Sequence, residues 1–283
     1  REGSGLVDFE KKYPERYFDV GIAEQHAVTL AGGMSCGGLK PIIAIYSTFL
    51  QRAYDQLIHD IVVQDLDILL AIDRAGIVGA DGETHQGIYD ISFLRILPKI
   101  VLMTPSDELE MWKMLSTGQK HKGLAAVRYP RGYSQGEDIS LDDTTIEIGK
   151  SRIIEKGSKI AYLVFGTLLH DVKKVAQKNG ATVVDMRFVK PLDENMIIDI
   201  CNTHDYVFTV EDNVILGGAG TAVNEVMSKY SLKNNLINIG VPDKIIPHGS
   251  QDEILSELGL NELGIEKITN DHIHNMVEIS SKI

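Results

Sequence analysis

The sequence predicts an α/β protein built of two consecutive parallel-sheet domains. Its 283 residues exceed what a single ordinary core organises, since hydrophobic cores grow efficiently only to about 100 to 200 residues. Short β-branched runs alternate with apolar runs of helical spacing, which is typical of parallel strands joined by covering helices. Polar residues without apolar periodicity occupy 134–138 and 142–145 and predict a linker. We therefore expect domains over 1–135 and 147–283.

The first domain is expected to begin with a turn and a short helix over 5–13. A parallel α/β unit normally begins with a strand, so we expect the first strand of this domain upstream of Arg1. Strands are predicted at 17–20, 41–46, 67–72, 100–104 and 124–129. Apolar residues at helical spacing after the second of these predict an amphipathic helix with an apolar stripe of Phe49, Ala53, Tyr54, Leu57, Ile58, Ile61 and Val62.

The second domain repeats the alternation of strands and helices. Strands are predicted at 159–165, 182–186, 206–210 and 236–239, with helices between them. The glycines of 217–220 precede one of these helices, and exposed amides there could bind an anion. We favour a tight strand-to-helix turn at this position.

Composition excludes several classes of function. A formal charge of -12 disfavours nucleic-acid binding, which needs basic surface. No apolar run approaches the roughly 18 residues of a membrane span, so no membrane contact is expected. Cys36 and Cys201 lie far apart, which argues against disulfides and thiolate metal sites and favours a reducing, cytoplasmic compartment. His272 and His274 lack a third convergent ligand, and His59 lies on a predicted helix, so no metal site is expected.

Glu24 stands where a predicted strand ends, a glycine turns the chain and an apolar helix begins. Ligands of α/β proteins bind at such positions. The acid can also simply complement the helix dipole, at about 0.3 to 1 kcal/mol, and the residues alone favour that interpretation. Small and apolar residues at 20–23 would desolvate the carboxyl and raise its pKa, as acid/base chemistry requires.

Aromatic side chains mark the next strand-to-helix junction, at Tyr46, Phe49 and Tyr54. An aromatic ring at this position can stack on a planar ligand. Periodicity assigns Tyr54 to the apolar stripe and leaves both interpretations open for Phe49.

Residues 73–87 form a long predicted loop that combines four glycines with Arg74, Asp81 and His85. Glycine permits close approach of the backbone to a ligand, and long loops with convergent ionisable residues favour function over a plain surface loop. Arg128 and Arg131 follow the last strand of the domain and can hold a phosphate bidentately. A structural ion pair is an equally good interpretation for Arg128.

Taken together, these four segments resemble the 1-deoxy-D-xylulose-5-phosphate synthases, a group of transketolase-like, thiamine-diphosphate-dependent transferases. Residues 21–25 are common to the superfamily, which includes transketolases and the β subunits of 2-oxoacid dehydrogenases. The segments that resemble the synthases more narrowly are 46–56, 74–87, 103–108 and 127–132. Residues 186–193, and 211–213 followed by 217–220, resemble the transketolase C-terminal domain. The resemblance implies a pyrimidine-binding, transketolase-like domain followed by a transketolase C-terminal-type domain.

The resemblance implies a cofactor site for thiamine diphosphate. Glu24 matches the acid that hydrogen-bonds N1′ of the aminopyrimidine, and a partly protonated carboxyl suits that task. Phe49 matches the residue that stacks on the pyrimidine, and Tyr46 lines the same pocket.

The resemblance also implies the substrates pyruvate and D-glyceraldehyde 3-phosphate. Arg74 and Arg131 match the arginines that grip the phosphate of glyceraldehyde 3-phosphate. Asp81 and His85 match polar groups near the pyruvate-derived adduct, where they can steer proton transfers. The products would be carbon dioxide and 1-deoxy-D-xylulose 5-phosphate, a precursor for isoprenoid, thiamine and pyridoxal biosynthesis.

Members of this family carry a preceding domain with a Gly-Asp-Gly motif and a downstream Asn that hold magnesium and the cofactor's diphosphate. The sequence contains no such element. We therefore expect this chain to be the C-terminal part of the enzyme, inactive without an N-terminal half or subunit, and to work as a homodimer. The alternatives are a β-type subunit of a 2-oxoacid dehydrogenase, a split transketolase, or a non-catalytic assembly fragment.

Overall fold

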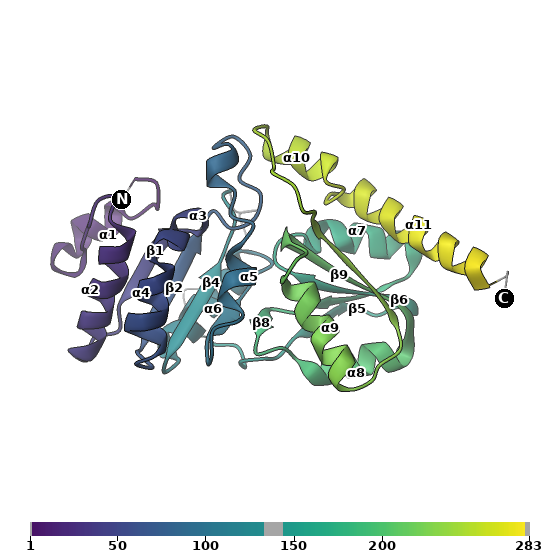
Figure 1. The fold of residues 1–283 in the computed structure, drawn as a ribbon, viewed down its shortest axis with the longest axis horizontal. Helices are drawn as coiled ribbons and strands as arrows, with labels where there is room; N and C mark the ends of the chain where they lie inside the picture. The colour runs from purple at the N-terminus through teal and green to yellow at the C-terminus, as the bar shows by residue number, and fades with distance from the viewer. Residues whose placement is uncertain (1, 133–143, 281–283) are drawn as a thin grey trace.

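The computed structural model describes residues 2–132 and 144–280, with side chains described as far as residue 276. It contains two α/β domains that lie side by side, each with a five-stranded sheet (Figure 1). The two-domain α/β prediction is confirmed. The predicted linker falls at 134–138, outside the described residues, and at 142–145, of which only the last two residues are described.

The sheet of the first domain is built around four parallel strands. Its order is β1-β2-β4-β3, with the short strand β8 added at the β3 edge. Every residue of β2, Ile68–Asp73, is buried because helices cover both faces of the sheet, as parallel sheets require. The remaining strands of this sheet are β1 Ile42–Tyr46, β3 Val101–Met103, β4 Leu124–Arg128 and β8 Phe188–Lys190.

Helices of the first domain begin where the sequence provides start signals. Asp107 accepts a hydrogen bond from the Glu110 backbone N–H at 2.7 Å and so caps α6, Glu108–Lys120. The predicted helix over 5–13 is confirmed as α1, Val7–Lys12, and α2 spans Glu24–Cys36. The shorter α5 spans Asp90–Leu94.

The amphipathic helix predicted from residue 49 is present but irregular. It consists of α3 Ser47–Leu50, a 3₁₀ turn Gln51–Ala53, α4 Tyr54–Gln56 and a π-helical turn Leu57–Val62. Ala53, Leu57 and Ile61 of the apolar stripe are nevertheless buried, and Tyr54, Ile58 and Val62 pack half-buried against the same core. Tyr54 packs edge-on against Phe93 and donates to its carbonyl at 2.6 Å, which confirms its assignment to the core.

The predicted strand at 17–20 is wrong. The backbone there is irregular, and the Asp19 side chain accepts a hydrogen bond from the Gly21 N–H at 2.9 Å. Such a local bond competes with strand pairing, and Gly21 has a positive φ of 65° that turns the chain toward α2. The β-branched and aromatic residues in this segment misled the prediction.

The second domain has the sheet order β10-β9-β6-β7-β5, with β5 as an antiparallel edge strand. The four predicted strands are confirmed, and β5 was not predicted. The strands are β5 Arg152–Glu155, β6 Lys159–Phe165, β7 Thr182–Asp185, β9 His204–Val214 and β10 Asn235–Val241. The helices are α7 Leu169–Asn179, α8 Glu194–Thr203, α9 Ala219–Lys229, α10 Gln251–Glu257 and α11 Glu262–Ser280.

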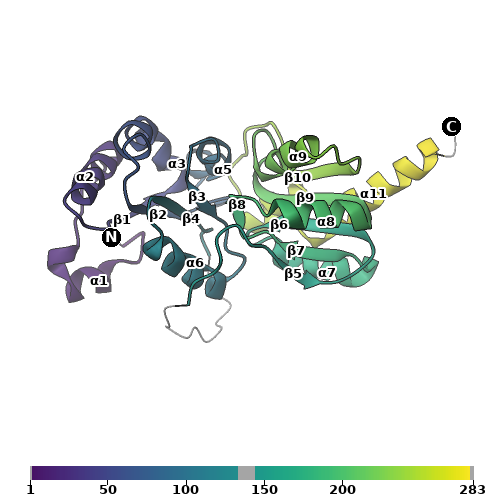
Figure 2. The same cartoon turned by 90° about the horizontal axis from the view of Figure 1, so that it is seen from below.

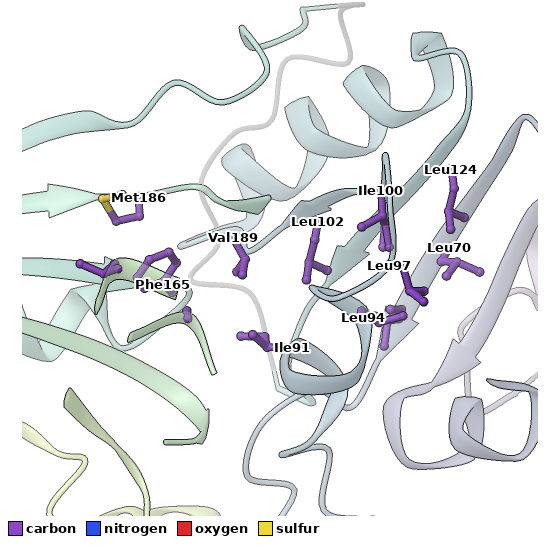
Figure 3. Packing of buried hydrophobic residues seen from close by; sticks show 14 of the residues in the cluster. Leu70, Ile91, Leu94, Leu97, Ile100, Leu102, Leu124, Phe165, Met186 and Val189 are labelled. Carbon is purple, nitrogen blue, oxygen red and sulfur yellow. The ribbon is translucent and has the colours of Figure 1, made fainter. Parts of the chain in front are cut away.

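A single apolar core runs through the boundary between the domains. Figure 3 shows Leu102 and Ile91 of the first domain close to Val189, Phe165 and Met186, and all five belong to one buried cluster. Strand β8 pairs antiparallel with β3 at the edge of the first sheet, so backbone hydrogen bonds also join the domains (Figure 2). Because apolar side chains of both domains share this core, the domains are held as one body.

Ionic groups are also buried at this boundary. Arg128, at the end of β4, bonds Asp90 at 2.9 Å and Asp212 of the second domain at 2.5 Å. Burial alone lowers the pKa of Arg128, but Asp212 and Asp90 raise it by more, so the net shift is upward. The sequence left two interpretations for Arg128, a phosphate-binding residue and a structural ion pair. The structure shows the ion pair.

Beside this cluster, Glu211 lies fully buried at the N-terminus of α9. Its carboxyl accepts hydrogen bonds from the Ala219 and Gly220 N–H groups, both at 2.8 Å. An external anion would need these same N–H groups, and the Glu211 carboxyl already occupies them. The interpretation of 217–220 as a strand-to-helix turn is thus confirmed.

Glu211 gives a first prediction, on pH-dependent stability. Burial raises its pKa from 4.5 to about 8, against the opposing effect of its two backbone hydrogen bonds. Between these values the folded state holds a proton that the unfolded state releases, so the stability contributed by Glu211 falls as pH rises. We expect the wild type to lose stability relative to Glu211→Gln from about pH 5 to about pH 8, by at most about 1.4 kcal/mol per pH unit.

Urea unfolding of both proteins across that range measures the difference. Glu257→Gln, on the exposed surface of α10, is the matched control and should follow the wild type. A constant offset between wild type and Glu211→Gln at every pH would contradict the assigned pKa.

Candidate functional site

The candidate site lies where three neighbouring parallel strands end. Strands β1, β2 and β4 are adjacent and parallel, so their carboxyl ends meet at one edge of the sheet. Ligands of open α/β sheets bind at this edge. Six predicted site residues come from these strand ends, and Glu24 comes from the start of α2. Tyr46 ends β1 and Phe49 follows it, Arg74, Asp81 and His85 follow β2, and Arg131 follows β4.

Glu24 lines a cavity of about 460 Å³ together with Tyr46 and Phe49. Apolar residues supply most of its wall, including Val20, Ala27, Ile43 and Ile45. The Glu24 side chain is 14% exposed and accepts a hydrogen bond from Arg52 at 3.0 Å. A mostly apolar cavity with one carboxyl on its wall fits a flat heteroaromatic ring that carries a nitrogen.

The environment of the Glu24 carboxyl differs from the prediction at one residue, Ile22. Ile22, expected to shield the carboxyl, is 92% exposed. The positive φ of Gly21 turns the chain so that this side chain faces outward. Arg52 and the cavity wall cover Glu24 instead.

The two predicted aromatic residues form a row. The rings of Tyr46 and Phe49 are nearly parallel, with centroids 5.7 Å apart and an interplanar angle of 11°. The His85 ring meets Phe49 edge-on at 5.2 Å, and the Arg52 guanidinium lies 4.8 Å from the Phe49 centroid. Because Phe49 also lines the cavity, its position favours the interpretation that its ring stacks on a ligand.

Arg74 lies at the other end of this row. Its guanidinium sits 4.0 Å from the centroid of the Tyr46 ring, and its side chain is 16% exposed. It pairs with Asp73 and donates to the Gly3 carbonyl at 3.0 Å. Burial raises the pKa of Asp73, and Arg74 opposes that shift. Arg74 also has a positive φ of 54°, and strain of this kind concentrates at functional sites.

Asp81 joins the two predicted phosphate-binding arginines. Its carboxylate bonds Arg131 at 2.6 Å and lies 3.9 Å from Arg74 Nε. The Arg131 side chain is 46% exposed, so this pair faces solvent. Two guanidinium groups that share one small carboxylate can also share a phosphate, which offers more acceptor oxygens.

The loop that carries Asp81 and His85, residues 75–88, is named the site loop. A backbone bridge closes it at its base. Gly76 donates to the Gly87 carbonyl at 2.7 Å, and Gly87 donates back to Gly76 at 2.9 Å. Any Cβ at Gly87 would lie 1.9 Å from the Arg74 carbonyl oxygen. Glycine is therefore required for the loop to return beside Arg74.

Sequence reasoning missed Arg52 as a member of the site. It lies outside the predicted apolar stripe, but it bonds Glu24 and its guanidinium lies over the Phe49 ring. Its position three residues after Phe49 places both on one helical face and was the available signal. Its pairing with Glu24, 28 residues earlier, has no signature in a single sequence.

Among the described residues, no group of three or more His, Cys, Asp or Glu side chains could hold a metal ion. Across the same residues, no helix is long and apolar enough to cross a lipid bilayer.

Comparisons with known proteins agree with this architecture. Residues 1–135 match the family model of the transketolase pyrimidine-binding domain, and residues 149–265 match the transketolase C-terminal domain. The chain is 57% identical over 273 residues to a 1-deoxy-D-xylulose-5-phosphate synthase of Vibrio campbellii, and 56% identical over 266 residues to one of Pseudomonas entomophila. These alignments cover 96% and 94% of this chain but 44% and 42% of the relatives, so the chain spans less than half their length.

Two solved structures have a similar fold. A split-gene transketolase, described as an inactive β4 tetramer, has a TM-score of 0.85 and 26% identity, with 95% of this chain and 88% of that chain covered. A transketolase from Campylobacter jejuni has a TM-score of 0.70 and 16% identity, with 90% of this chain and 39% of that chain covered.

The base of the site loop gives a second prediction. Gly87→Ala must displace the Arg74 carbonyl, so we expect it to lower the free energy of unfolding by about 1 to 3 kcal/mol. Gly33→Ala is the control, because a Cβ in the middle of α2 meets nothing within 4 Å and should stabilise by up to about 1 kcal/mol. Urea denaturation measures both, and equal stability of the two variants would refute the packing argument.

Proposed function

This chain belongs to the transketolase family, as a pyrimidine-binding domain joined to a C-terminal domain, and we propose that it is the C-terminal part of a 1-deoxy-D-xylulose-5-phosphate synthase. The reaction joins carbon 2 of pyruvate to the aldehyde carbon of D-glyceraldehyde 3-phosphate and releases carbon dioxide. The observation that carries the proposal is the meeting of a carboxyl-bearing aromatic cavity with two guanidinium groups at one sheet edge. Thiamine diphosphate, when bound, supplies the nucleophilic carbon for this chemistry.

Glu24 would act on the ring end of the cofactor. Its position on the cavity wall lets its carboxyl hold a proton against a ring nitrogen, which is general acid/base work. The bond from Arg52 would keep the side chain directed along the wall. Phe49 and Tyr46 would orient a planar ring by stacking, and the apolar wall would exclude water.

Arg74 and Arg131 would bind the phosphate of the aldehyde substrate. Their shared contact with Asp81 supports this assignment, because the two groups already converge on one anionic partner. This local positive pair offsets a chain whose formal charge is -12. Asp81 and His85 would face pyruvate and guide protons, and the contact of the His85 ring with the Phe49 ring supports this assignment.

The proposal requires an N-terminal half that holds magnesium and the diphosphate. The described residues offer no carboxylate cluster for a metal, and the longer relatives extend well beyond the region aligned here. The similar split-gene transketolase chain is described as inactive, which supports a dependence on a second half. We also propose a cytoplasmic homodimer as the working assembly.

A β subunit of a 2-oxoacid dehydrogenase is the main alternative. Such a subunit passes an acyl group to a lipoyl arm, which carries no phosphate. The convergence of Arg74 and Arg131 therefore favours the synthase.

Reconstitution tests the proposal. The chain is mixed with the N-terminal half of a synthase, thiamine diphosphate and magnesium, and carbon dioxide release from pyruvate is assayed with D-glyceraldehyde 3-phosphate. We expect release only when every component is present. Glu24→Ala should reduce the rate at least about 100-fold, since it removes the acid/base group. Glu257→Ala, at an exposed site on α10, should retain the wild-type rate.

Full activity of the isolated chain would refute the need for a second half. An active Glu24→Ala variant would remove the role assigned to that carboxyl.

Arg131 gives a separate prediction about specificity. Arg131→Ala in the reconstituted enzyme should raise KM for D-glyceraldehyde 3-phosphate about 10- to 100-fold and leave KM for pyruvate within about twofold. Arg16→Ala removes an exposed guanidinium of the same domain and should change neither constant. An equal rise in both KM values for Arg131→Ala would contradict phosphate binding by this residue.

A further inference from the structure

The site loop, which comprises residues 75–88, is anchored at its base in the second domain. Ile77 and Ile88 are each 1% exposed and belong to the core cluster formed mainly by residues of β6, α7, β9 and β10. The Ile88 carbonyl accepts a hydrogen bond from the Val214 N–H at 2.9 Å. The loop leaves the first domain at β2, enters the core of the second and returns.

Asp212 fixes the bridge at the base of the loop. One carboxylate oxygen bonds Arg128, whose guanidinium lies 3.4 Å from the Gly87 carbonyl. The carboxylate also packs so closely on Gly76 that a Cβ there would lie 2.1 Å from Asp212 Oδ2. Asp212 therefore contacts one side of the bridge directly and reaches the other through Arg128.

A second contact holds the loop nearer its tip. The Gln251 side chain, at the start of α10, donates to the Ile77 carbonyl at 2.7 Å. The backbone of Gln251 lies so close that a Cβ at Gly79 would be 2.5 Å from its nitrogen. Between this contact and the bridge at Gly87 lie Asp81 and His85, the groups that face the proposed substrates.

We propose that Asp212 and Gln251 are positioning residues, through which the second domain sets the place of Asp81 and His85 relative to Arg74, Arg131 and Phe49. The loop tip has few anchors in the first domain: Thr48 bonds the Thr84 carbonyl at 3.0 Å, and Asp81 pairs with the two arginines. The His85 ring also meets Phe49 edge-on, so the first domain holds the tip by these contacts and the second domain holds the base and the segment around Ile77. This inference rests on the proposed function for its effect on catalysis but not for its effect on the loop.

Another buried ionic contact between the domains serves as the matched control. Glu110 of α6 accepts a hydrogen bond from Arg187 at 3.0 Å and has no exposed side-chain surface. It lies away from the loop, because Arg187 precedes β8 at the edge of the first sheet, and β4 and β3 separate β8 from β2, which leads into the loop. Glu110→Gln should weaken domain docking without moving the site loop.

Amide hydrogen exchange on the whole chain tests the positioning role without any assay of activity. Asp212→Asn should speed exchange of the amides of 76–88 about tenfold relative to the wild type, while α2 exchanges at the wild-type rate. Gln251→Ala removes only a side chain at the surface and keeps the test decisive if Asp212→Asn folds poorly. Its effect should appear at 77–85.

The reconstituted enzyme gives the second readout. Gln251→Ala and Asp212→Asn should raise KM for D-glyceraldehyde 3-phosphate and lower kcat by about tenfold each, since small misplacements of reacting groups are costly. Half-saturation by thiamine diphosphate should stay within about twofold, because Glu24 and Phe49 stand on other elements. A merely structural role would lower only the apparent kcat, through the amount of folded enzyme, and would leave KM and the half-saturation concentration unchanged.

Wild-type exchange of 76–88 in both Asp212→Asn and Gln251→Ala would overturn the proposal, and so would an equal acceleration in Glu110→Gln. Faster loop exchange together with unchanged substrate constants would also overturn it. If the wild-type mixture shows no synthase activity, the proposed function fails, and the exchange result still decides whether the second domain positions the loop.

Discussion

The parallel pairing of β1, β2 and β4 is the constraint on which the candidate site depends. Residues far apart in the chain reach one sheet edge only because these three strands are neighbours with the same direction. The aromatic row, the arginine pair and the acid of α2 are all arranged around that edge. Strand β4 contributes twice, since Arg128 ends it inside the protein and Arg131 follows on the surface.

Charge is balanced locally throughout the site. Each described guanidinium near the cavity has a carboxylate partner: Glu24 for Arg52, Asp73 for Arg74 and Asp81 for Arg131. An incoming anion must therefore compete with Asp81, while Asp73 keeps Arg74 in place through a contact that is largely shielded from water. The site is thus preorganised for exchange of one anion for another and does not begin as an open positive patch.

Most of the fold followed from local patterns, because buried parallel strands leave continuous apolar runs that are easy to recognise. Candidate site residues could be named because strand ends and helix starts are visible in the sequence, as with Tyr46 and Glu24. Features that depend on contacts between distant segments were not predicted. Strand β8 is three residues long and pairs across the domain boundary, and Arg52 acts through an acid from another helix. The exposed side chain of Ile22 also could not be foreseen, since the turn at Gly21 decides its direction.

The continuous core between the domains also bears on how genes of this type can be divided. A break between the two domains would leave Leu102 and Ile91 on one product and Phe165 and Met186 on the other, with apolar surface open to water on both. A break ahead of the first domain leaves that core whole. The pair of domains is therefore expected to fold as one unit, and single-domain halves are poor candidates for independent products.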